Sequence, residues 1–284
     1  MSEFEVRPLT PTIGAEVHGV DLSKPIDTTL RERIEQTLLE HQLIFFPKQR
    51  MSPDDHVALG RCFGELQTNH PPYLRVLDAE HPEIIVIESD ETHPANVVDR
   101  ANVWHTDITW HEFPPTGSIL HMQEIPETGG DTMWTSLTAA YDALSEPMKR
   151  MLDTLTAVHD LTEAVLRIGI EANAPRDAIL DFAKQLSSAE HPVVRTHPRT
   201  GRKGLFVNRT FTSHIKGIPR AESDAILAFL YEHVIQPEFS VRRRWGKGDV
   251  GIWDNRCTSH YAISDYGNAH RRIHRVTILG ERPQ

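Results

Sequence analysis

The sequence predicts an α+β fold with a double-stranded β-helix (jelly roll) core, flanking helices and a helical insertion. Three observations support this prediction. Short apolar or alternating segments, separated by turn residues, recur along the chain and are typical of strands in such a core. Helical periodicity is concentrated near the start of the chain and in one central stretch. Strands and helices do not alternate regularly, which argues against a doubly wound sheet or an α/β barrel.

Length and composition limit the classes of protein to consider. The 284 residues contain no internal repeat or low-complexity linker, so we expect one domain over residues 1–284. No apolar run approaches the ~20 residues of a membrane span, and the start lacks a secretory signal pattern. The only cysteines are Cys62 and Cys257, so we expect a reducing cytoplasm. The formal charge of −10 argues against nucleic acids and anionic membranes as partners.

Helical and extended segments follow each other over the first ninety residues. Apolar residues that recur every four positions predict a helix over about 28–42, capped by Asp27 or Thr28. Ser52-Pro53, a capping residue followed by proline, predicts a second helix that ends near Gly64. Extended segments are predicted at 13–17, 43–46 and 84–87.

The rest of the chain is predicted to consist mainly of strands and turns. Helices are expected at 136–144, 146–156 and 220–235. Residues 89–103 are predicted to be a polar loop and 162–188 a helical insertion, and both are expected to close over a site. Strands are predicted at 104–110, 118–123, 131–135, 193–197, 205–208, 240–245, 249–253 and 271–279.

The segment 104–110 carries two candidate metal ligands. It is rich in β-branched and aromatic residues and therefore favours a strand. Residues two apart on a strand point to the same side, so we expect His105 and Asp107 to project together. A neutral imidazole and a carboxylate at a fixed separation are two of the three ligands that a divalent metal would need.

His260 is the candidate for the third ligand. The predicted strand at 249–253 leads into a polar turn that carries this histidine. Two histidines and one carboxylate, with one face of the metal left open, are the ligand set of non-haem Fe(II) oxygenases. A lone His-x-Asp pair more often has a structural role, so the assignment depends on the residues that follow. Asp254 is interpreted as support for the turn and Cys257 as a small buried residue.

Two arginines on the last predicted strand indicate anionic ligands near the metal. Arg271 follows His260 by eleven residues and shares one strand face with Ile273 and Arg275. A guanidinium in the protein interior is costly without an anion, and it pairs best with a planar carboxylate. We therefore expect one anion at each arginine. The alternative is that either arginine faces solvent or pairs with a structural aspartate.

These residues resemble the taurine/α-ketoglutarate dioxygenase family of Fe(II)- and 2-oxoglutarate-dependent oxygenases. The resemblance extends over nearly the whole chain. It includes Ile13-Gly14-Ala15, Trp104-His105-Thr106-Asp107, Gly129-Gly130-Asp131-Thr132, His191-Pro192-Val193-Val194-Arg195, Trp253-Asp254-Asn255-Arg256 and His274-Arg275-Val276-Thr277.

The resemblance implies a role for each of these site residues. It makes His105, Asp107 and His260 the Fe(II) ligands. It makes Arg271 the residue that binds the distal carboxylate of the cosubstrate 2-oxoglutarate, assisted by the Thr132 hydroxyl, and dioxygen the second cosubstrate. Arg275 and His70 would bind the anionic group of the substrate. The full set of implied substrate contacts is His70, Tyr73, Ile108, Phe211 and Arg275.

The implied reaction hydroxylates the carbon next to sulfur in a small sulfonate such as taurine. It releases sulfite and an aldehyde together with succinate and carbon dioxide. The taurine members carry an Asp/Asn-rich run before the metal segment, whereas this chain has Arg100-Ala101-Asn102-Val103. This difference weakens amine recognition, so an alkyl sulfate ester or another small anion is the alternative substrate. The family commonly forms dimers or tetramers, so we expect a homo-oligomer.

Two functions of other classes would use some of the same residues. A zinc hydrolase would use His105, Asp107 and His260 with an activated water, and it would not need an inward-facing arginine at position 271. A non-enzymatic jelly-roll sensor would bind 2-oxoglutarate without forming succinate.

Overall fold

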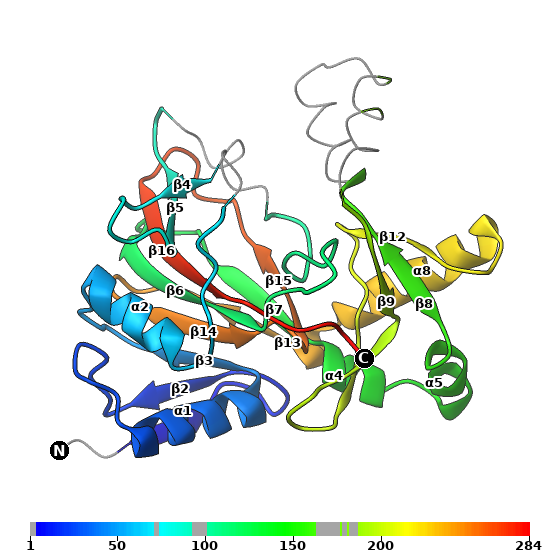
Figure 1. Ribbon diagram of the computed structural model, residues 1–284, viewed down its shortest axis with the longest axis horizontal. Helices are drawn as coiled ribbons and strands as arrows, with labels where there is room; N and C mark the ends of the chain where they lie inside the picture. The colour runs from blue at the N-terminus through cyan, green and yellow to red at the C-terminus, as the bar shows by residue number, and fades with distance from the viewer. Residues whose placement is uncertain (1–3, 71–73, 93–100, 163–176, 178–180, 182–186) are drawn as a thin grey trace.

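The computed structural model describes residues 4–70, 74–92, 101–162, 177, 181 and 187–284. Its largest element is an eight-stranded sheet in which only β2 and β3 are parallel neighbours (Figure 1). In spatial order, its strands are β1 (Glu5–Pro8), β2 (Ala15–His18), β3 (Leu43–Phe46), β14 (Val250–Asp254), β6 (Gly117–Glu124), β16 (Arg271–Ile278), β5 (Ile84–Ser89) and β4 (Arg75–Val76).

Three smaller sheets and five helices complete the described part of the fold. The sheets are β13 (Ser240–Arg243), β7 (Thr132–Ser136) and β15 (Thr258–Ala262); β12 (Thr212–Ile215), β8 (Thr156–His159) and β9 (Ala189–Pro192); and β10 (Val194–Thr196) with β11 (Lys203–Leu205). The helices are α1 (Thr28–His41), α2 (Pro53–Arg61), α4 (Leu137–Asp142), α5 (Glu146–Leu152) and α8 (Arg220–Val234), followed by the short 3-10 turn η1 (Pro237–Phe239).

The two N-terminal helices form where their capping residues predict. The Asp27 side chain accepts a hydrogen bond from the backbone of Leu30 and starts α1, and Gln42 ends this helix in the left-handed conformation. Ser52 and Asp55 form a reciprocal capping box at the start of α2. Both helices pack on the large sheet, as Figure 1 shows.

The large sheet is buried on both faces because its strands carry apolar residues at successive positions. On β3, Ile44 and Phe46 pack in one cluster with the buried side chains of α1 and α2. Leu43 and Phe45 point to the opposite face and pack with Trp134 of β7. One face is therefore covered by helices and the other by the sheet β13-β7-β15, and the edge of this second interface carries the site described below.

A second lobe packs beside these two sheets. It contains β8 to β12 and helices α4, α5 and α8, and its core is apolar. Figure 1 shows this lobe on the right of the molecule, and the C-terminus ends next to it. The backbone of Thr196 in β10 donates a hydrogen bond to the last residue, Gln284, and anchors the end of the chain there.

Two of the predicted elements are wrong and matter for the site. Residues 104–110 do not form a strand: His105 makes an isolated bridge to His260, and turns occupy 107–110. Ile108 has a φ of 53°, which is incompatible with a strand. His260 lies on β15 and not in a polar turn. The apolar content of 104–110 reflects burial more than strand pairing.

Other differences concern short segments. The strands β4, β8, β9 and β12 were not predicted, and the helix expected at 146–156 ends at Leu152. Most of the predicted insertion at 162–188 lies outside the described residues, as do 93–100 of the predicted loop. Short strands with alternating polar residues carry too weak a pattern to be distinguished from loops.

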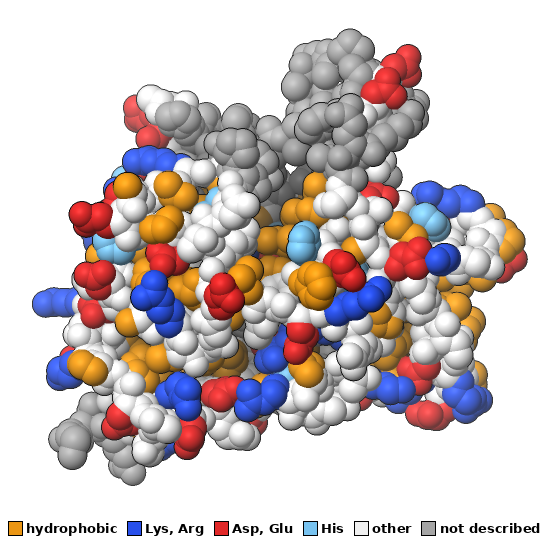
Figure 2. All heavy atoms as spheres, viewed as in Figure 1, with side chains coloured by type: hydrophobic (Ala, Val, Ile, Leu, Met, Phe, Trp, Pro, Cys, Tyr) orange, Lys and Arg blue, Asp and Glu red, His pale blue; other side chains and the backbone are white. Residues whose placement is uncertain are grey.

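The described surface gives two further observations. None of the described helices is long and apolar enough to cross a membrane. On the face shown in Figure 2, Lys and Arg side chains are interspersed with Asp and Glu. Because charges of both signs alternate among the described residues of this face, they form no broad region of one sign that would attract a charged ligand, and individual side chains have to recognise it.

Candidate metal centre

Backbone pairing holds His105 and His260 side by side. The backbone N–H of His105 donates to the carbonyl of His260 at 3.0 Å, and the reverse bond measures 2.8 Å. Residues paired in this antiparallel way point their side chains to the same side. The two imidazole centroids are accordingly 4.1 Å apart. Trp134 and Trp253 pack against the His260 ring and limit its movement.

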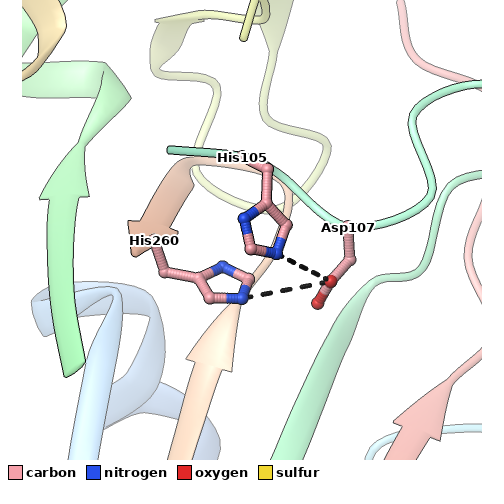
Figure 3. A group of neighbouring side chains, drawn as sticks. All are labelled: His105, Asp107 and His260. Carbon is pink, nitrogen blue, oxygen red and sulfur yellow. Dashed lines mark ion pairs between the residues drawn. The ribbon is translucent and has the colours of Figure 1, made fainter. Parts of the chain in front are cut away.

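Asp107 reaches the two histidines through a turn. Its Oδ1 lies 3.7 Å from Nε2 of His105 and 4.0 Å from Nε2 of His260, so that one oxygen faces both rings (Figure 3). Asn255 fixes the Asp107 backbone: its Oδ1 accepts from the N–H at 2.9 Å and its Nδ2 donates to the carbonyl at 3.1 Å. His105, Asp107 and His260 therefore lie together, as the sequence predicts. A turn at 107–110 brings Asp107 into place, and not the alternation of side chains along a strand.

The three side chains fit a divalent metal. Their candidate ligand atoms all lie within 4.8 Å of one another, and each residue is less than a tenth exposed. Nδ1 of His105 donates to the carbonyl of Val103 at 2.7 Å, so in the neutral tautomer that this bond selects, the lone pair is on Nε2, which faces Asp107. Two imidazole nitrogens and one carboxylate oxygen are the donor set that suits Fe(II) with open positions.

The electrostatics prepare these groups to bind a cation. Burial, with a smaller effect of the His105 charge, lowers the pKa of His260 to about 3, so its imidazole is neutral near pH 7. Burial raises the pKa of Asp107, but Arg275 and the two histidines outweigh it and hold that pKa below its usual value. The metal would therefore meet a neutral His260 and an ionised carboxylate, neither of which needs to release a proton.

Arg275 connects this centre to β16. Its Nη2 donates to Oδ2 of Asp107 at 2.8 Å and to Oγ of Ser118 at 3.0 Å, and Oδ1 is left for the metal. The guanidinium lies 5.6 Å from the Trp253 ring centroid. Within the described residues, its buried Nε has no hydrogen-bond partner. Arg275 is thus a positive group beside the metal ligands with a donor still available for an anion.

His70 lies within range of the Arg275 charge. Burial and, to a smaller extent, Arg275 lower the pKa of His70, and its Nε2 pairs with the carbonyl of Pro82 at 3.1 Å. The pairing of these two residues around one anion stays a prediction. Tyr73, the other predicted contact in this segment, lies outside the described residues.

Arg271 occupies a second, separate position on β16. It is 3% exposed, and its guanidinium lies 5.5 Å from the ring centroid of Tyr266, whose hydroxyl is bonded to Ser89. A Cβ at Gly130 would lie 3.3 Å from Cδ and Nε of Arg271, so glycine leaves room for this side chain. The buried arginine predicted from the sequence is therefore present, and it does not face solvent.

The remaining predicted residues lie around these groups. Thr132 is buried at the start of β7, two residues after Gly130, and its hydroxyl accepts from the Trp245 indole at 2.9 Å. The Phe211 ring lies 6.2 Å from that of His105 and 4.4 Å from that of Trp110. Ile108 lies in the turn beside Asp107. Phe211 and Trp110 together give an aromatic wall next to one metal ligand.

Sequence reasoning missed several residues that complete the centre. Asn255 hydrogen-bonds the backbone of Asp107, and the Ser118 hydroxyl accepts a hydrogen bond from Arg275. Gly130, which has no side chain, leaves room for Arg271. In the sequence, Gly130 and Asn255 were noted only within the motifs that carry the family resemblance. Their partners lie far away in sequence, so spacing alone contained no signal for these contacts.

The chain is similar to known proteins over most of its length. Residues 5–277 match the family model described as taurine catabolism dioxygenase TauD, TfdA family. An alpha-ketoglutarate-dependent sulfate ester dioxygenase from Pseudomonas putida is 38% identical, over 99% of this chain and 91% of its own length. The structure of a taurine dioxygenase from Burkholderia xenovorans matches with a TM-score of 0.84 at 37% identity, over 99% of this chain and 90% of that chain. The structure of AAD-2 in complex with Mn(II) and N-oxalylglycine matches with a TM-score of 0.81 at 25% identity, over 99% of each chain.

Proposed function

Because the chain belongs to the taurine catabolism dioxygenase TauD/TfdA family, we propose that this α-ketoglutarate-dependent dioxygenase oxidises a small alkyl sulfate ester or alkanesulfonate at the carbon bearing the sulfur group. The observation that carries this proposal is the position of Arg275, which holds the metal-binding carboxylate and keeps a buried donor available. Family membership also decides against the zinc hydrolase and the non-enzymatic sensor.

The described residues would divide the work between metal, cosubstrate and substrate. His105, Asp107 and His260 would hold Fe(II), and Arg271 with Thr132 would hold the distal carboxylate of 2-oxoglutarate. When bound, iron would activate dioxygen, which is the oxidant: one oxygen atom would go to the substrate carbon and the other to 2-oxoglutarate, which becomes succinate and carbon dioxide. Iron is inferred from the donor set. The chain itself orients the reactants and excludes water.

Arg275 and His70 would bind the sulfur oxyanion. The charge of Arg275 lies next to Asp107, so the anionic end of the substrate would be placed beside the metal ligands. Phe211 and Trp110 supply an apolar wall for the alkyl chain. Hydroxylation of the carbon that bears the leaving group gives an unstable adduct. It breaks down to an aldehyde and sulfite from a sulfonate, or to an aldehyde and sulfate from a sulfate ester.

We favour a sulfate ester with an uncharged chain over taurine. Asp107 pairs with Arg275 and would bind the metal, so it cannot neutralise a substrate ammonium group. This chain has Arg100-Ala101-Asn102-Val103 where the taurine members carry an Asp/Asn-rich run. The similarity to a sulfate ester dioxygenase supports the same choice.

We also propose that the large sheet and β13-β7-β15 together form the double-stranded β-helix. The shared apolar cluster between them supports this arrangement. The family match over 5–277 supports a single catalytic domain. The cytoplasmic location and the homo-oligomer remain predictions.

The test combines product analysis with one pair of variants. Hexyl sulfate, hexanesulfonate and taurine are supplied with Fe(II), 2-oxoglutarate and oxygen, and succinate, aldehyde, sulfate and sulfite are measured. We expect succinate and aldehyde in equal amounts, with hexyl sulfate the best substrate. Sulfate release without oxygen and 2-oxoglutarate would instead indicate a hydrolase.

Arg275→Ala is expected to lower turnover of every substrate at least 100-fold, because one charge-assisted anion contact is lost. Because Arg275 also holds Asp107, the variant should bind Fe(II) more weakly, but at saturating Fe(II) it should keep the charge-transfer band that Fe(II) and 2-oxoglutarate give without oxygen. Arg272→Ala is the matched control, because Arg272 lies on the same strand β16, three residues before Arg275, and its charge acts on Glu88 and His274 instead of on Asp107. Loss of the band in Arg275→Ala would mean that the roles of Arg271 and Arg275 are exchanged.

A further inference from the structure

The turn that follows Asp107 is buried and held by side chains from the second lobe. Thr109 has no exposed surface. Nε2 of His191 lies 2.9 Å from the carbonyl of Thr109 and 3.1 Å from that of His111, so its N–H donates to both. Nδ2 of Asn208 donates to the Thr109 hydroxyl at 3.2 Å, and Nδ1 of His159 lies 2.9 Å from the same oxygen. We call His159, His191 and Asn208 the Thr109 clamp.

The clamp is a rigid unit. Its three residues are at most 3% exposed. The imidazole centroids of His159 and His191 are 5.2 Å apart, and the Phe206 ring packs against both. Burying three polar side chains is costly unless they are hydrogen-bonded. Here the bonds converge on one short turn, so the second lobe has a specific mechanical connection to it.

The turn needs such a connection because its backbone is strained. Ile108 is β-branched and has a φ of 53°, in the left-handed region that such residues rarely adopt. A conformation of this kind is costly and persists only where the surroundings determine it. Asn255 holds the turn at Asp107, and His191 holds it at Thr109 and His111. The strained residue lies between these two anchors.

We propose that the Thr109 clamp, and His191 above all, positions the metal ligand Asp107. His191 is a positioning residue: among the described residues, its hydrogen bonds and ring contacts involve neither a metal ligand nor a predicted substrate contact, and it acts through the backbone of the turn. Its double hydrogen bond keeps Ile108 in the left-handed conformation, and that conformation points Oδ1 of Asp107 at both histidines. The inference rests on the proposed function, because the metal that Asp107 would bind is the iron of a dioxygenase.

The test compares two substitutions at position 191. His191→Leu removes the donor, whereas His191→Gln keeps an amide N–H close to the place of Nε2. Fe(II) is titrated without oxygen in the presence of 2-oxoglutarate, and the charge-transfer band is followed with and without hexyl sulfate. We expect His191→Leu to weaken Fe(II) binding about 10–100-fold, as loss of a supporting partner of a metal ligand does. His191→Gln should stay within about threefold of the wild type, since it restores the same donor.

His233→Leu is the matched control. His233 is also buried, and its Nε2 donates to the carbonyl of Ala140 at 2.7 Å, at a site in α8 that does not include the metal ligands. The control loses the same kind of bond and should lose similar stability, but it should bind Fe(II) as the wild type does. Thr109→Val, which removes only the hydroxyl, serves as a second variant if His191→Leu does not fold, and should weaken Fe(II) binding by up to about tenfold.

Each outcome decides one question. If His191→Leu or, where it does not fold, Thr109→Val binds Fe(II) as tightly as the wild type, the clamp does not position Asp107 and the inference is wrong. The inference is also wrong if His233→Leu weakens Fe(II) binding as much as His191→Leu, because the effect would then be general destabilisation. If the wild type itself shows no charge-transfer band, the proposed function fails and not the role of the clamp.

Discussion

Two buried clusters in this molecule contain nearly the same residue types and differ in chemistry. His105, Asp107 and His260 form one, and His197, Asp254 and Cys257 form the other. In both clusters the candidate ligand atoms lie within 4.8 Å of one another. Proximity is therefore equal and composition differs by one residue, a cysteine in place of a histidine, so the hydrogen bonds already made by each group are the main difference between them.

The second cluster is a closed ion pair. Arg256 donates to Asp254 through Nε to Oδ1 at 2.9 Å and through Nη2 to Oδ2 at 2.7 Å. Nε2 of His197 also bonds Oδ2, at 2.9 Å. Burial raises the pKa of the Cys257 thiol well above its usual value, so this sulfur stays protonated and is a poor ligand. A cation would find no available lone pair there.

The first cluster keeps its lone pairs. Arg275 uses Oδ2 of Asp107, and Oδ1 faces the two imidazole nitrogens. The comparison shows that a ligand set is defined by atoms that remain available, and not by residue types in proximity. The closed cluster still serves the site, because Asp254 begins the turn between β14 and β15 that places His260.

The largest difference is expected in stability. Asp254→Asn should lower the free energy of unfolding by about 3–5 kcal/mol, because it leaves the buried Arg256 without its counter-ion. Asp107→Asn should cost less, since Arg275 keeps its bond to Ser118. Urea unfolding of the metal-free variants measures both. Equal losses would show that the two carboxylates are held in the same way.

For Fe(II) affinity, we expect the opposite order: a substitution at Asp107 should have a large effect and a substitution in the cluster of Asp254 and Cys257 a small one. Asp107→Ala is expected to weaken Fe(II) binding more than 100-fold, beyond the effect of losing a supporting residue. Cys257→Ala should leave Fe(II) affinity within about twofold, because its thiol is protonated and far from available as a ligand. Anaerobic Fe(II) titration gives both values. A second equivalent of tightly bound metal that disappears in Cys257→Ala would break the comparison.

The sequence could predict the residues of the metal centre but not their supports. His105, Asp107 and His260 were predicted as metal ligands from their chemical types and, together with the two arginines of β16, from the family resemblance, and the three ligands do converge. The strand predicted at 104–110 was wrong, because a β-branched residue at φ 53° is stabilised by distant partners and local propensity does not include them. Local patterns predicted that the fold mixes strands and helices. They did not predict every element, because local propensity does not include distant partners.

The supports depend on long-range contacts. Asn255 lies 148 residues from Asp107, and His191 lies 82 residues from Thr109. The pattern around each of them predicts an ordinary strand end or turn. Nor does the sequence distinguish the open cluster from the closed one, because Arg256 two residues after Asp254 is equally compatible with an exposed turn. Which polar atoms remain available is a property of the packed structure.

The smallest expected difference is in the pH dependence of the free energy of unfolding. It tests whether burial keeps His260, in the cluster with His105 and Asp107, neutral and ready to bind a metal. The pKa of His260 is lowered to about 3, mainly by burial, whereas an unfolded histidine titrates near 6.5. As the pH falls below about 6.5, the unfolded chain takes up a proton on this imidazole and the folded, metal-free protein does not. The free energy of unfolding therefore falls by about 1.4 kcal/mol per pH unit from this residue, or about 2 kcal/mol between pH 6.5 and 5.

His260→Gln should remove this part of the acid sensitivity. Urea unfolding of the metal-free wild type and variant at pH 6.5 and pH 5 measures it, and the variant should lose about 2 kcal/mol less. His56→Gln is the control, because burial also lowers the pKa of His56 to about 3 at a site on the helix-covered side of the sheet. Equal effects in the two variants would show that burial alone keeps the ligand neutral. If the acid sensitivity of His260→Gln equals that of the wild type, His260 takes up its second proton in the folded, metal-free protein as well. Fe(II) would then have to displace that proton from the imidazolium.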